Sequence, residues 1–277
     1  MTKFGLISVG LALALNFASM ALGTDYLMSV ALVFGGVCAY FLANGWGKYT
    51  RRDLVVVGIL IAFSDVMTLV IEKLMLYYDV WGFSNRHFRM IGFQLFGAPV
   101  EEFIYWWACP VVVALGYVSF LRVDSVRAPS ATAMGEAALL AQAATVAIQG
   151  SHRPDPTAYL ETSGVAVQNG RQYERGVKKP AYIWLQVIIL AMIAFLARSF
   201  KGSWKAVGWT VAVFVAIAYP NERYSLGSGF WAYNENRLLG VWVLGVPVEE
   251  WIMYTICPLC ACLMMDAIDR LVRKLGL

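Results

Sequence analysis

Long apolar runs separated by short polar segments make up most of this chain. The runs cover residues 4–22, 26–45, 54–77, 98–121, 181–198, 205–221 and 245–266. Each is long enough to cross the roughly 30 Å hydrocarbon core of a bilayer as an α-helix. The pattern therefore predicts an all-α polytopic membrane protein with seven or eight transmembrane helices, depending on the longer segment at 122–180.

Composition supports this prediction. The chain is 60% hydrophobic and only 14% charged, whereas a soluble domain carries about a quarter charged residues. We expect an integral protein of the cell (inner) membrane. With a net charge of +4 and no basic stripe, a nucleic-acid partner is not expected. The first run could be a cleaved signal peptide, but an uncleaved helix is the favoured prediction.

One segment of the chain occurs twice. Residues 89–110 and 237–258 align without a gap, and 10 of the 22 positions are identical. Unrelated segments would share about one or two, so the alignment marks an internal repeat. Each copy places the sequence Pro-Val-Glu-Glu at the head of an apolar run. Charged groups at such a position are costly in a membrane, which makes these glutamates candidates for function.

The repeat divides the chain into four parts. We expect an N-terminal helix over 1–25, homologous three-helix units over 26–121 and 181–277, and a linker over 122–180. Basic residues follow the first and third spans of both units, which predicts that the units face the same way. Since three is an odd number, the linker must then cross as well, and residues 131–149 are its candidate helix. Glu136 weakens that helix, and an interfacial helix is the alternative.

The repeated carboxylates suit acid/base chemistry. The motif prolines, Pro99 and Pro247, fit the first position of a helix, so the glutamates fall in its first turn. Adjacent helical residues point about 100° apart, so one glutamate of each pair can face a cavity while its neighbour meets another environment. An acid and a base require two carboxyl groups in different environments. We predict catalytic roles among Glu101, Glu102, Glu249 and Glu250, with simple helix capping as the alternative.

Further site residues flank the motif. Glu72 stands nine residues before Trp81, and Glu222 nine before Trp231, although anchoring at the membrane interface is the commoner role of such tryptophans. The predicted supporting residues are Asp65, Glu72, Glu222, Arg89 and Arg237. Asp65 lies mid-membrane, and the arginines could neutralise a glutamate or meet headgroups. The aromatic residues expected to bind substrate or stabilise a cation are Trp81, Phe103, Trp106, Trp107, Trp231, Tyr233, Trp251 and Tyr254.

No metal or disulfide is predicted. The five cysteines all lie in apolar runs, and the chain has only two histidines. Small buried thiols explain the cysteines better than a metal site does.

At these residues the chain resembles the fused form of the heterodimeric-type lycopene cyclases of bacteria, archaea and fungi. That family carries two homologous three-helix units, each with a P-x-E-E signature preceded by a W-x-aromatic segment. Here the signatures are Pro99–Glu102 and Pro247–Glu250, and the resemblance covers about 26–121 and 181–266. The additional first helix, the long linker and the unrepeated Asp65 depart from it.

The resemblance implies a lycopene β-cyclase, an isomerase that acts on an acyclic carotenoid in the membrane without a cofactor. An acid would protonate C2 of the ψ end group, the neighbouring double bond would close the ring, and a base would remove a proton. No G-x-G-x-x-G fingerprint predicts a flavin. The alternative function is a proton- or ion-coupled transporter that uses the paired carboxylates.

Overall fold

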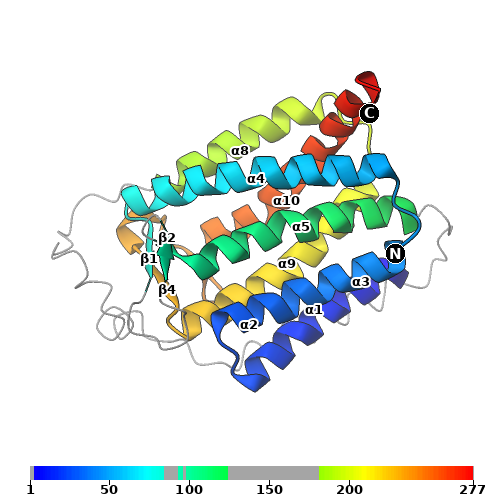
Figure 1. Ribbon diagram of the computed structural model, residues 1–277. Coiled ribbons are helices and arrows are strands. Elements are labelled where there is room, and N and C mark those ends of the chain that lie inside the picture. Colours follow the sequence, from blue (N-terminus) through cyan, green and yellow to red (C-terminus); the bar gives the residue numbers. More distant parts are fainter. Residues whose placement is uncertain (1–2, 84–92, 96–97, 124–180, 277) are drawn as a thin grey trace.

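The computed structural model describes residues 3–83, 93–95, 98–123 and 181–276. The helices lie side by side in one bundle, and short strands gather at one of its ends (Figure 1). The helices are α1 (Lys3–Leu22), α2 (Tyr26–Val30), α3 (Gly36–Gly45), α4 (Arg51–Tyr77), α5 (Val100–Val123), α8 (Ala181–Ala197), α9 (Trp204–Gly227) and α10 (Val248–Lys274). A π-helical turn, Ala31–Gly35, joins α2 to α3, and a 3₁₀ turn covers Glu235–Arg237. The strands are β1 (Trp81–Phe83), β2 (Gln94–Leu95), β3 (Ala98–Pro99), β4 (Trp231–Tyr233), β5 (Trp242–Val243) and β6 (Val246–Pro247).

Each of the seven apolar runs forms a helix, which confirms the all-α membrane architecture. Within the described residues, α1, α2–α3, α4, α5 and α10 are long and apolar enough to cross a bilayer. The helix α8 is shorter, with 17 residues. The helix α9 continues six residues beyond its expected end at 221 and carries Glu222 inside its last turns. The candidate helix 131–149 lies outside the described residues.

The two units face the same way, as predicted. The strands β1 and β4, which are equivalent segments of the two units, pair antiparallel, with Trp81 opposite Tyr233 and Phe83 opposite Trp231. Inverted units would place these segments at opposite ends of the bundle. The carboxyl end of α5 and the amino end of α8 lie at opposite ends of the bundle (Figure 1).

The helices are arranged around an approximate two-fold axis. The third helices of the units, α5 and α10, contact each other, and α4 and α9 each contact both of them. The first helices follow the same rule, since α3 packs on α5 and α8 packs on α10. The Pro-Val-Glu-Glu segments therefore come together at the end that carries the strands.

The helix α1 packs against α9, where it compensates for a proline. Pro220 has no N–H to donate to the carbonyl of Ala216, four residues earlier. The Asn16 amide donates to that carbonyl at 3.2 Å and to the carbonyl of Ile217 at 3.3 Å. Two further bonds hold the polar end of α9, from Asn221 to the Ser29 hydroxyl at 2.9 Å and from Tyr224 to a backbone carbonyl of the α1–α2 turn at 2.6 Å.

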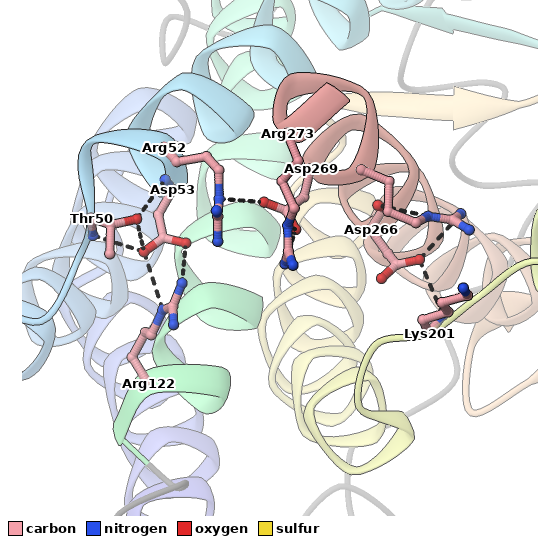
Figure 2. A network of polar contacts seen from close by, with 9 residues as sticks. Thr50, Arg52, Asp53, Arg122, Lys201, Asp266, Asp269 and Arg273 are labelled. Carbon is pink, nitrogen blue, oxygen red and sulfur yellow. Dashed lines mark hydrogen bonds and ion pairs between the residues drawn. The ribbon is translucent and has the colours of Figure 1, made fainter. Parts of the chain in front are cut away.

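The opposite end of the bundle is held by ion pairs (Figure 2). Thr50 and Asp53 form a capping box that begins α4. The Asp53 carboxylate also accepts two bonds from Arg122 of α5, at 2.8 and 3.2 Å. Arg52 pairs with Asp269 of α10 at 2.8 Å. These contacts join α4 to the third helix of each unit.

Candidate active site

A cavity of about 90 Å³ lies at the strand end of the bundle, between the two units. Three carboxyl groups line it: Glu102 of α5, Glu222 of α9 and Glu250 of α10. The aromatic lining residues are Trp81, Tyr105, Trp106, Tyr182, Phe214, Trp231, Tyr233 and Tyr254. Cys109, Met253 and Cys257 complete the lining.

A hairpin places each glutamate pair at the start of its helix. In the second unit, Leu244 and Gly245 form a two-residue loop between β5 and β6, and both have positive φ, at 51° and 77°. This loop type matches the twist of the flanking strands. Pro247 ends the hairpin and is the N-cap of α10. The first unit has the equivalent β2–β3 pair before α5, so both pairs lie at positive helix ends, which favour anions.

The two glutamates of each pair point to different surroundings, as their 100° separation predicts. Glu250 lines the cavity, whereas the Glu249 carboxylate accepts a bond from the backbone N–H of Leu239 at 2.5 Å. Gln186 of α8 donates to the backbone carbonyl of Glu249 at 2.8 Å. Glu249 therefore holds the loop that leads into the hairpin. In the first unit Glu102 lines the cavity, and Glu101, although buried, is not among its lining residues.

The glutamate and the tryptophan that stand nine residues apart are hydrogen-bonded to each other in both units. The Trp81 indole N–H donates to Glu72 at 3.2 Å, and the Trp231 indole N–H donates to Glu222 at 3.0 Å. Both indoles are buried, so interfacial anchoring is not their role. Glu222 also accepts a bond from the Tyr233 hydroxyl at 2.7 Å.

Two tyrosines that the sequence analysis did not select contact the second glutamate of each pair. The Tyr26 hydroxyl donates to Glu102 at 2.9 Å, and the Tyr182 hydroxyl lies beside Glu250. Each tyrosine stands at the start of the first helix of its unit. They lie 76 and 68 residues before their glutamates, so the spacing does not repeat. No gapless comparison could have found them.

The clustering of carboxyl groups in and near the cavity favours states in which some of them are protonated. Among the described lining residues none is basic, while three carboxyl groups share one apolar space and Glu72 lies near Glu102. Repulsion between like charges favours states in which some of these groups are protonated. Burial, together with the neighbouring Glu222, raises the pKa of Tyr233 well above its usual value. Its hydroxyl therefore remains a neutral hydrogen-bond donor.

The other predicted site residues lie elsewhere. Asp65 is half-buried in the middle of α4, and Arg237 is half-buried in the turn before β5; neither lines the cavity. Arg89 lies outside the described residues. Phe103, Trp107 and Trp251 also stand away from the lining. Trp251 instead donates to the carbonyl of Val243 at 3.0 Å and so supports the hairpin.

The cavity also contains soft sulfur groups. Cys109 and Cys257 occupy equivalent positions of the two units and line it together. All five cysteines are free thiols. The part of the chain that the structure describes has no group of three His, Cys, Asp or Glu placed to hold a metal ion.

Comparison with known families identifies the chain. The model of the lycopene cyclase family matches residues 10–120 and 180–268. No match is found among curated proteins or among solved structures. The matched ranges contain both Pro-Val-Glu-Glu segments and all the described residues that line the cavity. Because they cover well over half of the sequence, the chain belongs to the lycopene cyclase family.

Proposed function

We propose that this carotenoid cyclase of the membrane closes a β ring at the ψ end groups of lycopene by redox-neutral acid/base catalysis. One observation carries the proposal. Glu102, Glu222 and Glu250 meet in a single aromatic cavity without a described cation. Such a cavity can hold a carboxylic acid and a carboxylate side by side. We place the protein in the cell membrane, where its substrate dissolves.

The reaction consists of one proton gained and one proton lost. A cavity carboxylic acid protonates C2 of the terminal double bond, which leaves a tertiary cation at C1. The C5=C6 double bond then attacks through C6, so that the C1–C6 bond forms and the cation moves to C5. A second carboxylate removes the proton from C6, and the C5=C6 double bond of the β ring is restored. A general acid and base must lie within hydrogen-bond reach of the reacting atoms.

The cavity walls suit a carbocation. Water would capture the cation as an alcohol, and the largely apolar lining of the cavity disfavours water there. The rings of Tyr105, Trp106, Trp231 and Tyr254 surround the carboxyl groups. Aromatic faces attract a cation without acting as strong nucleophiles.

The transporter alternative gains no support. Transporter sites are typically formed by helices that are interrupted near the middle of the membrane. Here Pro110 and Pro258 lie within the continuous helices α5 and α10.

The test is cyclisation of lycopene in lipid vesicles by the purified protein, with no flavin or nicotinamide added. Monocyclic or bicyclic product with β rings, separated by chromatography and identified by absorption and mass, is the expected result. In heavy water each new ring should gain one deuterium at C2. Unchanged lycopene from a folded wild-type protein would overturn the proposal.

Neighbouring glutamates provide matched controls. We expect Glu102→Gln to lower the rate at least about 100-fold, the range for loss of a general acid or base, and Glu250→Gln, which removes a cavity carboxyl group, to lower it as well. Glu249→Gln keeps a carbonyl oxygen that can accept a hydrogen bond from the Leu239 N–H, so we expect this variant to retain most of the activity. Equal losses in Glu249→Gln and Glu250→Gln would contradict the assignment of the cavity glutamates.

A further inference from the structure

The paired strands β1 and β4 end in residues that differ by one hydroxyl group. The paired strands read Trp-Gly-Phe in the first unit and Trp-Ala-Tyr in the second, with Trp81 opposite Tyr233 and Phe83 opposite Trp231. Two further pairs of donors stand at corresponding places of the two units, Trp81 with Trp231 and Tyr26 with Tyr182. Position 83 has no hydroxyl, and position 233 has one.

That hydroxyl bonds glutamates of the second unit, Glu222 and its neighbour Glu250. Glu222 Oε1 accepts two bonds, from the Tyr233 hydroxyl at 2.7 Å and the Trp231 indole at 3.0 Å. Glu72 Oε1 accepts one longer bond, from Trp81 at 3.2 Å, and its Oε2 is buried without a described hydrogen-bond partner. Donors to a carboxylate stabilise its charged form. The extra donor therefore favours the anion in the second unit.

We propose that Tyr233 is a positioning residue that makes Glu222 the proton acceptor of the cyclisation and leaves Glu102, the cavity glutamate of the first unit, as the proton donor. This inference rests on the proposed function and assigns roles within it. Glu222 becomes the base because two neutral donors hold its carboxylate toward the cavity. Glu102 becomes the acid because one hydrogen bond, from the Tyr26 hydroxyl at 2.9 Å, stabilises its anion, whereas Glu222 accepts two.

Other titratable groups surround Glu222 from each packed element. They are Tyr26 of α2, Glu102 and Tyr105 of α5, Tyr182 of α8, and Glu250 and Tyr254 of α10. None is a cation. The proton taken by Glu222 therefore remains within a cluster of acids and phenols, from which it can return to Glu102 for the next cycle.

The experiment compares two matched Tyr→Phe variants by their pH–rate profiles in lipid vesicles. In Tyr233→Phe the base loses a donor and binds its proton more tightly, so we expect the acidic limb to move to higher pH. The expected shift is about one to two pH units, the effect of one hydrogen bond to a charged group. In Tyr26→Phe the donor to the acid is lost, so the basic limb should move to higher pH instead.

A second variant keeps the test decisive if Tyr233→Phe does not fold. Trp231→Phe removes the other donor to the same Glu222 oxygen and should also move the acidic limb. Thermal unfolding establishes that each variant is folded. An unchanged profile in both Tyr233→Phe and Trp231→Phe, or movement of the basic limb, would overturn the inference.

A readout without substrate separates this inference from the proposed function. The infrared C=O band of protonated carboxyl groups should grow in Tyr233→Phe at a fixed pH, and Glu222→Gln should abolish that increase. Failure of the wild type to cyclise lycopene would refute the proposed function alone. A band that does not respond to Tyr233→Phe would refute the role of Tyr233 alone.

Discussion

The contact between Asn16 and the proline of α9 provides a prediction that can be worked out in detail. Pro220 leaves the Ala216 carbonyl without its usual helical donor, and the Asn16 amide of α1 donates to it at 3.2 Å. Asn16→Leu keeps a side chain of similar size but removes that donor. The variant should therefore report the hydrogen bond and not a change in packing.

The loss of stability in Asn16→Leu depends on whether another donor can replace the amide. A buried polar group left without a partner costs about 1–3 kcal/mol, whereas hydrogen bonds between membrane helices average about 0.6 kcal/mol because partners are usually exchanged. Ala216 has no helical N–H to take over, so we expect about 1–2 kcal/mol. For a chain of this size that corresponds to a Tm lower by roughly 2–8 °C.

The assay is thermal unfolding of purified protein in detergent, followed by circular dichroism. Ser8→Ala is the matched control, since Ser8 is equally buried in α1 but donates only to the Phe4 carbonyl of its own helix. We expect that change to cost less than about 0.5 kcal/mol.

A double-mutant cycle tests the mechanism directly. Pro220→Ala restores the N–H that the Ala216 carbonyl lacks, so Asn16→Leu should cost less in that background. The expected coupling is at least about 0.5 kcal/mol, in the range measured for residues in contact. An equal cost of Asn16→Leu in both backgrounds would refute the reasoning.

Three further changes probe the site's surroundings. Asp53→Asn should lower the stability by about 1 kcal/mol, because the pair with Arg122 is partly exposed, and should leave cyclisation unchanged; calorimetry and the vesicle assay check this. Gly245→Ala should cost about 1–3 kcal/mol, since φ is +77° and a Cβ would lie 2.8 Å from the Arg223 side chain; a normal Tm would contradict it. Asp65→Asn should keep wild-type turnover, because Asp65 lies outside the cavity lining, and a large loss would assign it a role in catalysis.

The sequence predicted which segments form helices, the approximate bounds of these helices and the common orientation of the units. Hydrophobic length and loop charge determine these features, and both are local properties. The end of α9 was placed too early, at 221, because Pro220, Asn221 and Glu222 resemble a helix end. The Asn16 amide donates to the carbonyl that Pro220 leaves without a donor, Ser29 accepts from Asn221, and Trp231 and Tyr233 donate to Glu222. The helix therefore continues to Gly227.

Only the local features of the candidate site could be predicted from the sequence. Spacing along one helix separates Glu249 from Glu250, and a repeated nine-residue interval marks Glu222 with Trp231. The partners Tyr26 and Tyr182 come from helices distant in sequence, at intervals that do not repeat. Contacts of this kind depend on how the helices pack, which a single sequence does not reveal.

The distribution of charge explains why the site lies where it does. The ion pairs drawn in Figure 2, such as Arg122 with Asp53 and Arg52 with Asp269, lie at the end of the bundle away from the cavity. At the strand end, the described partners of Glu102 and Glu222 are neutral phenol and indole groups. An arginine beside these glutamates would hold them as anions and leave no proton to give to an alkene. Neutral donors orient the carboxyl groups while allowing one to keep its proton, which is the state that the proposed acid-initiated cyclisation requires.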